Sequence, residues 1–380
     1  MQHLLSIQAL RALAAVMVVF HHAQNDAGRT AAELGAPFAR LFALPWAAGV
    51  DLFFVVSGFV MVFSSEKMFA APGGAGQFMS RRIARIVPLY WLATAIFAAA
   101  ALRGAAAGKQ IAPSLGEILS SFAFLPFPRG IDGAPRPVHS LGWTLEYEMF
   151  FYLVFACFLW FSRTRAVASV TALLGALVAF NVLAAPQNVA LAFWSDPIVL
   201  EFALGMGIAL LYRAGVRLKG FAVAALIVPA ALVLAFDPMH SADEYFDAVT
   251  PNGFLRLFAW GVPMAAVFAA STLGAAAPGA ANAPGPAYAP MRALAKIGDA
   301  SYALYLFHPL ALIVLRKAWL AAGLAQSLGF WPLVVASTCA AIALALVIHV
   351  WVETPMTKVV QRWLSARAKT IDARPAASQA

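Results

Sequence analysis

Ten apolar segments recur along this chain, each about as long as a helix that crosses a lipid bilayer. They cover residues 4–23, 46–64, 83–102, 142–161, 166–185, 196–212, 219–236, 254–274, 300–315 and 331–352. A spanning helix needs ~20 predominantly apolar residues, and a helix satisfies its own backbone polar groups in lipid. The sequence therefore predicts an all-α fold, a polytopic integral membrane helix bundle of about ten transmembrane helices.

The composition excludes the other common protein classes. Of 380 residues, 62% are hydrophobic and 11% are charged, whereas about a quarter of a soluble domain is charged. A soluble enzyme, a disordered chain and a disulfide-linked secreted fold are all excluded, since Cys157 and Cys339 both lie in apolar runs. The net charge of +9 does not by itself indicate a nucleic-acid partner, because the basic residues of a membrane protein first report its topology.

The distribution of Lys and Arg orients the bundle. If the N-terminus lies inside, the inner segments hold 16 of these residues and the outer segments hold 9. Cytoplasmic segments carry the excess of basic residues, so both termini are expected to be cytoplasmic. We divide the chain into a transmembrane domain, residues 1–356, and a basic cytoplasmic tail, residues 357–380, which we expect to be flexible.

Several ionisable side chains lie inside the predicted spans, where each costs a few kcal/mol unless it faces a polar interior. They are Arg11, Asp51, Glu146, Glu148 and Glu201. Together they indicate a polar site within the bundle. The alternative interpretation is that these side chains pair with one another only to hold the helices together.

The first span places Arg11 and His22 on one face. They are eleven positions apart, which at 100° per residue brings them within about 20° of each other, and ~16 Å apart along the helix axis. His21 points about 100° away from His22. A neutral imidazole can take a proton from a hydroxyl near neutral pH, while an arginine stays charged and can hold an anion or a carbonyl group.

Three arginines precede the third span, and a carboxylate begins the second. Arg81, Arg82 and Arg85 form a good phosphate site at a helix N-terminus, although the positive-inside rule alone would also place them there. Asp51 lies near the outer end of the second span and can orient an imidazole.

Two further segments carry clustered polar side chains. The fourth span contains WTLEYEMFFY, in which Glu146 and Glu148 are two positions apart and point to different faces. The ninth contains SYALYLFHP, in which Tyr302, Tyr305 and His308 recur at helical spacing. The alternative for these three is an interfacial aromatic belt.

Taken in order, these motifs resemble acyltransferase family 3, the integral-membrane acyltransferases of bacterial polysaccharides and other hydroxylated acceptors. The resemblance runs nearly end to end and rests on Arg11 and His22 with ten residues between them, GVDLFFVVSGF, RRIARIVPLYW, WTLEYEMFFY, SYALYLFHP and the closing VETP. The fourth-span block is most similar to exopolysaccharide-production acetyltransferases, with Thr144 in place of the commoner serine. The family's glutamate corresponds to Glu148. The resemblance implies a cytosolic acyl-CoA donor and an acceptor on the other side.

We therefore expect a membrane O-acyltransferase of the bacterial cytoplasmic (inner) membrane that moves an acyl group, acetyl above all, from acetyl-CoA to a sugar hydroxyl of a surface or exported polysaccharide. The expected catalytic residues are His22 as general base, Glu148 and Asp51. The expected coenzyme-binding residues are Arg11, Arg81, Arg82 and Arg85, and the expected acceptor-binding residues are Trp143, Tyr305 and His308. The partners are a glycan or glycolipid acceptor and the lipid bilayer, with no metal and no nucleic acid. The alternative function is a secondary transporter of an acylated lipid or glycan precursor, with the buried charges as a proton relay.

Overall fold

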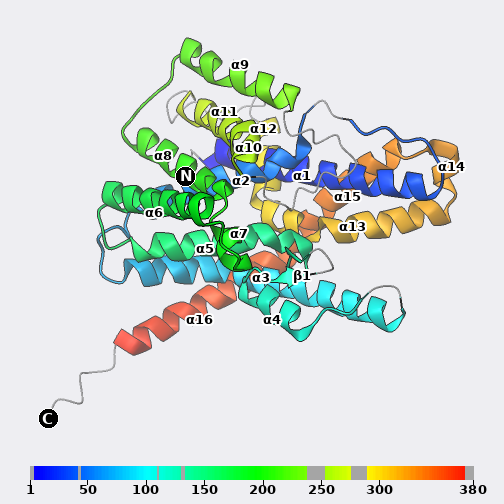
Figure 1. The fold of residues 1–380 in the computed structure, drawn as a ribbon, viewed down its shortest axis with the longest axis horizontal. Helices are drawn as coiled ribbons and strands as arrows, with labels where there is room; N and C mark the ends of the chain where they lie inside the picture. The colour runs from blue at the N-terminus through cyan, green and yellow to red at the C-terminus, as the bar shows by residue number, and fades with distance from the viewer. Residues whose placement is uncertain are drawn as a thin grey trace.

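The computed structural model describes residues 4–41, 44–108, 111–129, 133–237, 253–274 and 289–372. These residues are almost entirely helical (Figure 1). The α-helices are α1 (Leu4–Glu33), α2 (Gly49–Ser64), α3 (Gly74–Ala106), α4 (Leu115–Ala123), α5 (Trp143–Cys157), α6 (Arg163–Ala184), α7 (Val189–Trp194), α8 (Leu200–Arg213), α9 (Gly220–Phe236), α10 (Gly253–Arg256), α11 (Val262–Leu273), α12 (Ala289–Asp299), α13 (Ser301–Ala321), α14 (Leu324–Leu328), α15 (Trp331–Ile348) and α16 (Thr354–Asp372).

Short elements connect these helices. They are the 3-10 turns η1 (Trp46–Ala48), η2 (Ser140–Gly142) and η3 (Pro197–Val199), the π-helical turns η4 (Leu257–Gly261) and η7 (His349–Glu353), and the strands β1 (Pro128–Arg129) and β2 (Ala134–Pro135). The two strands pair antiparallel, with Arg129 opposite Ala134. A π-helical turn widens the helix by one residue and is frequent at functional sites.

The predicted all-α polytopic membrane bundle is confirmed. Seven helical segments of the described chain are long and apolar enough to cross a membrane: Leu5–Glu33, Trp46–Ser64, Gly74–Ala106, Arg163–Ala184, Gly253–Leu273, Ser301–Ala321 and Trp331–Leu364. The other three predicted spans coincide with the shorter helices α5, α8 and α9. That these three helices also cross the membrane stays a prediction.

Hydrogen bonds join the helix ends that the sequence predicts to share the cytoplasmic face. Glu66, just after α2, accepts hydrogen bonds from Arg163 at the start of α6 (2.8 Å) and pairs with Arg213 at the end of α8 (3.2 Å). At the opposite ends of α1 and α13, Arg316 contacts Asp26 at 2.6 Å. Both sets of contacts join helix ends that the predicted topology places on the same side of the membrane.

Helix α2 contacts its neighbours through backbone at three glycines. A Cβ atom on Gly58 would collide with the carbonyl oxygen of Phe202 in α8, and one on Gly205 of α8 would collide with the carbonyl oxygen of Val55. A Cβ atom on Gly49 would likewise collide with the carbonyl oxygen of Ala14 in α1. Small residues permit this close approach between helices in a membrane, and here they place α2 directly against α1 and α8.

The C-terminal part of the chain continues from α15 through the π-helical turn into α16. Within that turn, Nδ1 of His349 lies 2.8 Å from Oε2 of the buried Glu353. Helix α16 projects away from the rest of the bundle (Figure 1). Residues 357–372 of the predicted tail belong to α16, and residues 373–380 lie outside the described part of the chain.

The charge bias makes a topological prediction that fusions can check. Reporter domains fused after Arg165, Lys219 or Ala380 are expected to report the cytoplasm, and a fusion near Asp243 is expected to report the outside, because the basic segments stay on the inner face. Paired phosphatase and fluorescent-protein fusions measure both sides. A cytoplasmic signal at Asp243 would contradict both the ten-span topology and the side from which the donor enters.

Candidate functional site

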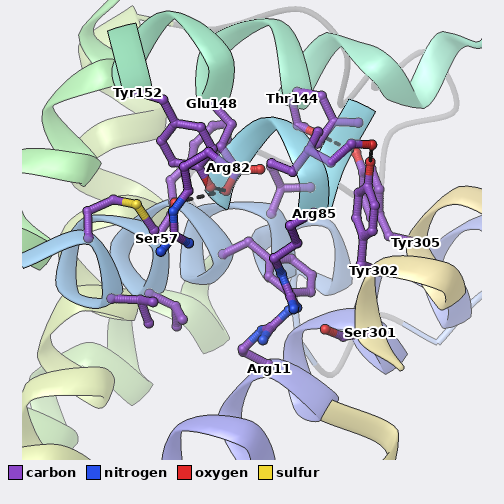
Figure 2. Close-up of a pocket in the computed structure, with 18 residues that line it drawn as sticks. Arg11, Ser57, Arg82, Arg85, Thr144, Glu148, Tyr152, Ser301, Tyr302 and Tyr305 are labelled. Carbon is purple, nitrogen blue, oxygen red and sulfur yellow. Dashed lines mark hydrogen bonds between the residues drawn. The ribbon is translucent and has the colours of Figure 1, made fainter. Parts of the chain in front are cut away.

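A cavity of about 120 Å³ lies inside the bundle between α1, α2, α3, α5 and α13. Its apolar wall is the face of α2 that carries Val56, Val60 and Met61. Its polar lining comes from all five helices (Figure 2) and consists of Arg11, Ser57, Arg82, Arg85, Thr144, Glu148, Tyr152, Ser301, Tyr302 and Tyr305. The structure thus brings together side chains from five helices that are spread over most of the sequence.

Two arginines face each other across this cavity. Arg11 of α1 and Arg85 of α3 extend toward one another from opposite walls (Figure 2). Arg11 donates a hydrogen bond to Gln8 (3.0 Å), and in the described part of the chain neither arginine forms an ion pair. The described lining contains three arginines and one carboxylate, that of Glu148. Cations in excess inside a membrane protein favour a nearby anion, so the cavity is suited to a negatively charged ligand.

The third arginine of the cavity is held by aromatic rings. Arg82 donates to the hydroxyl of Ser64 (3.0 Å), and its guanidinium lies over the rings of Phe78 (5.4 Å) and Tyr152 (5.9 Å). Arg81 is exposed and is not among the residues that line the cavity. Of the three arginines predicted to bind the coenzyme at this helix, the structure therefore brings Arg82 and Arg85 to the cavity and leaves Arg81 outside it.

One face of α5 supplies the carboxylate. Thr144, Glu148 and Tyr152 recur every four residues and all line the cavity. Ser57 donates to Oε1 of Glu148 at 2.9 Å, and Tyr152 donates to the same oxygen. Glu146 is fully buried outside the cavity lining, and its carboxyl oxygens form no hydrogen bond within the described residues. The two carboxylates thus lie on different faces, as the spacing predicted.

Two tyrosines of α13 close the cavity near α3 and α5. Thr144 donates to the hydroxyl of Tyr305 (2.9 Å), which in turn donates to the carbonyl of Leu141 (3.1 Å). Tyr302 donates to the carbonyl of Ile86 (2.7 Å). These bonds hold both phenol groups inside the protein. In an interfacial aromatic belt, the same groups would be exposed at the membrane surface.

His22 pairs with the other histidine that the sequence singled out. Nδ1 of His22 lies 3.1 Å from Nε2 of His308, one helical turn beyond Tyr305 on α13. Neither histidine is among the residues that line the cavity, and the ring of His308 lies 6.4 Å from the ring of Tyr305. The imidazole pair therefore lies next to the cavity rather than within its wall.

The neighbouring His21 has its basic nitrogen occupied. Arg40 donates to the amide oxygen of Asn25 (2.8 Å), which orients the amide so that its nitrogen faces Nε2 of His21 at 3.0 Å. An amide nitrogen can only donate, so Nε2 of His21 accepts this bond. A neutral His21 then has no lone pair left to take a proton from a substrate.

Asp51 has a partner that the sequence analysis missed. Arg256 donates from Nε to Oδ1 (2.9 Å) and from Nη2 to Oδ2 (3.0 Å) of Asp51, and both side chains are 0% exposed. The guanidinium lies over the rings of Trp143 (5.5 Å) and Trp260 (5.2 Å). Asp51 and Trp143 thus both contact Arg256, and neither is among the described residues that line the cavity. The sequence did contain an indication of this partner, because Arg256 lies two positions inside the apolar span predicted at residues 254–274.

The geometry of the cavity and the comparison with known families indicate the same class of protein. The fold and the cavity define a polytopic membrane protein whose helix bundle encloses a cavity lined by three arginines. The family described as "Acyltransferase domain" matches residues 4–350, and the chain belongs to this acyltransferase family. The resemblance inferred from the motifs is thereby confirmed.

Curated relatives support the same assignment. The chain is 33% identical over 300 residues to "Exopolysaccharide production protein ExoZ" of Rhizobium meliloti (strain 1021), which covers 78% of this chain and 86% of the relative. It is 29% identical over 252 residues to "Acyltransferase MdmB" of Streptomyces mycarofaciens, which covers 60% of this chain and 62% of the relative. No solved structure matches the chain.

Proposed function

We propose that this acyltransferase moves an acetyl group from cytosolic acetyl-CoA to a sugar hydroxyl of a surface or exported polysaccharide, in the bacterial cytoplasmic membrane. The observation that carries the proposal is the facing pair Arg11 and Arg85, which form no ion pair within the described chain and line an internal cavity. The phosphates of coenzyme A are anions that guanidinium groups bind by charge-assisted hydrogen bonds. Arg82 adds a third cation to the same wall.

The size of the cavity limits which part of the donor can enter it. A cavity of 150 Å³ holds one benzene molecule, and this cavity has about 120 Å³. The nucleotide is too large for this space and would remain at the cytoplasmic mouth near Arg82 and Arg85, while the pantetheine arm would pass along the apolar wall of α2 toward His22.

His22 is the proposed general base, and Glu148 the carboxylate that balances the charge of the site. A sugar hydroxyl is a poor nucleophile until a base removes its proton, and histidine suits that task near neutral pH. The ~16 Å between Arg11 and His22 along α1 is close to the reach of an extended pantetheine arm. The carbonyl carbon can then approach His22 while the phosphates stay near the arginines.

The acceptor is inferred from the relatives. One relative is named for exopolysaccharide production, which supports a polysaccharide acceptor for this chain. The orientation predicted from the basic residues places Arg82 and Arg85 toward the cytoplasm and the outer end of α1 toward the exported glycan. His22 lies between these two sides.

The proposed function is tested with purified protein in lipid nanodiscs. The protein is incubated with acetyl-CoA labelled in the acetyl group and with unacetylated exopolysaccharide fragments from a strain that lacks the gene. We expect label in the glycan and release of the free coenzyme thiol in equal amounts. If the label stays in acetyl-CoA, and the protein reconstituted in sealed vesicles takes up the glycan precursor, the result would support the transporter.

Removal of one cavity arginine is expected to weaken donor binding. Arg85→Gln should raise the KM for acetyl-CoA about 10- to 150-fold, because a hydrogen bond to a charged group contributes ~1.5–3 kcal/mol. Arg81→Gln is the matched control, since it removes the same charge from the same helix outside the cavity. Donor kinetics that are equal in the two variants would assign Arg85 a purely topological role.

A further inference from the structure

Six hydroxyl groups of the described residues line the cavity, and one of them forms no hydrogen bond within the described chain. The other five donate to a carboxylate, another hydroxyl or a backbone carbonyl, and they belong to Ser57, Thr144, Tyr152, Tyr302 and Tyr305. The exception is Ser301, whose side chain is 0% exposed. A buried polar group without a partner costs free energy, so each such group in a native protein calls for an explanation.

The hydroxyl of Ser301 is not used by its own helix. A serine at the N-cap of a helix usually accepts a hydrogen bond from a backbone N–H of the first turn. In α13 the N-cap is Ala300, no side chain caps this end, and Ser301 is the first residue of the helix. Its hydroxyl forms no hydrogen bond to the described backbone either. The partner of this hydroxyl must then be a ligand or a water molecule in the cavity.

The turn between α12 and α13 places Ser301 beside Arg11. A Cβ atom on Gly298, near the end of α12, would lie 1.9 Å from the carbonyl oxygen of Gln8, so this turn packs directly against the backbone of α1. The side chain of Gln8 donates to Asp299 and accepts from Arg11 at 3.0 Å. Helix α13 therefore begins next to Arg11, and the oxygen of Ser301 points toward the guanidinium of Arg11 (Figure 2).

The groups around this point define the chemistry of a ligand that could bind there. The guanidinium groups of Arg11 and Arg85 can only donate hydrogen bonds, and the hydroxyl of Ser301 has a proton to donate. Ser301 also lies at the N-terminus of α13, where the helix dipole is positive. A ligand atom held by all three side chains must accept hydrogen bonds, and negative charge on it strengthens each bond. An oxygen of a phosphate or of a carbonyl group has these properties.

We infer that the hydroxyl of Ser301 donates a hydrogen bond to an acceptor oxygen of the acyl donor, so that Ser301 is a further donor-binding residue beside Arg11 and Arg85. This inference rests on the proposed function, because that function supplies the donor. Acetyl-CoA carries suitable oxygens in two parts, the phosphates of its nucleotide and the carbonyl groups of its pantetheine arm and thioester. Both parts offer the same chemistry to Ser301.

Removal of the hydroxyl is expected to weaken donor binding without weakening the fold. Ser301→Ala should raise the Kd for acetyl-CoA about 3- to 10-fold, the effect of one lost hydrogen bond from a neutral group, as measured by equilibrium binding to protein in nanodiscs. Its midpoint of thermal unfolding without ligand should equal or exceed that of the wild type, because the lost hydroxyl has no partner in the described protein. A large fall in that midpoint would show that the hydroxyl is satisfied within the fold and would overturn the inference.

Thr272→Val is the matched control for this variant. The hydroxyl of Thr272 in α11 is also buried and without a partner among the described residues, but Thr272 is not among the described residues that line the cavity. We expect Thr272→Val to keep the wild-type Kd and to unfold at an equal or higher midpoint. A wild-type Kd in Ser301→Ala as well would assign the hydroxyl of Ser301 to a bound water molecule and overturn the inference.

Two fragments of the donor identify the oxygen that Ser301 binds. The isolated nucleotide carries all of the phosphates and none of the carbonyl groups, whereas S-acetylpantetheine carries the carbonyl groups without a phosphate. Each fragment is used to displace labelled acetyl-CoA from the wild-type protein and from Ser301→Ala. Weaker competition by the nucleotide in the variant would assign the bond to a phosphate, and weaker competition by S-acetylpantetheine would assign it to a carbonyl group.

The wild-type protein separates this inference from the proposed function. If acetyl-CoA does not bind to the wild type and no labelled acetyl reaches the glycan, the proposed function fails and this inference fails with it. If the wild type binds the donor and transfers the label, but Ser301→Ala binds acetyl-CoA as tightly as the wild type does, only the role of Ser301 fails.

Discussion

Replacing His22 with alanine is expected to lower kcat for glycan acetylation by ~10²–10⁴-fold, the range typical of a lost general base. His21→Ala should retain most of the activity, although the two residues are adjacent on α1. The reason is that Nε2 of His21 already accepts a hydrogen bond from Asn25, whereas His22 lies on the face of α1 that carries Arg11 and contacts His308 of α13 beside the cavity. The measurement is transfer of labelled acetyl in nanodiscs at matched protein concentration.

His21→Ala is also the structural control for this comparison, because it removes a neighbouring buried ring from the same helix. Binding of acetyl-CoA should be equal in both variants, since the arginines proposed to bind it line the cavity, and neither His21 nor His22 is among the described residues of that lining. Full activity in His22→Ala, or an inactive His21→Ala beside an active His22→Ala, would contradict the assignment of the base.

The second large effect is expected on stability. Arg256→Met leaves the buried carboxylate of Asp51 without its counter-ion, and breaking a buried ion pair from one side costs ~3–5 kcal/mol. The carboxyl of Glu201 also lies close to both residues, and in the described part of the chain no second cation pairs with Asp51. We expect the free energy of unfolding in detergent micelles to fall by about this amount.

Two companion variants make the measurement decisive. Arg29→Gln removes an arginine that is 76% exposed and 3.9 Å from its partner Asp26, and exposed pairs contribute little. The double variant Asp51→Leu/Arg256→Met removes both charges and should be more stable than Arg256→Met alone. If Arg256→Met were as stable as Arg29→Gln, the buried pair would not stabilise the fold.

The fold could be predicted from the sequence because lipid imposes one simple requirement on every span. Each long apolar run had to become a helix, and the ten predicted segments coincide with helices of the structure. Helix length was less predictable. Helices α5, α8 and α9 are shorter than the seven long spans, because turns at Ser140–Gly142 and Pro197–Val199 take part of the apolar sequence before α5 and α8.

Helical periodicity predicted part of the candidate site. The four-residue spacing of Glu148 with Thr144 and Tyr152 was visible in the sequence, and the structure places all three at the cavity. Spacing could not separate Arg81 from Arg82 and Arg85, because the face that α3 turns inward depends on its contacts with other helices. Only the structure shows which of the three reach the cavity.

Pairings between distant segments could not be predicted. Asp51 and Arg256 are 205 positions apart, and His22 and His308 are 286 apart. A single sequence contains no information on which helices become neighbours, since any buried cation can satisfy any buried carboxylate. The expectation that Asp51 orients His22 stays a prediction, and in the structure the carboxylate oxygens of Asp51 accept from Arg256.

The glycine contacts of α2 restrict how a ligand can enter. Backbone already touches backbone at Gly58, Gly205 and Gly49, so α2 cannot slide or rotate toward α8 or α1 without a collision. The apolar side of the cavity is therefore held in place by backbone contacts on both sides of α2. Any widening of the cavity must come from the facing helices, above all from α3, which carries Arg82 and Arg85 and packs against the projecting α16. A wider cavity would thus require that α3 and its two arginines shift together.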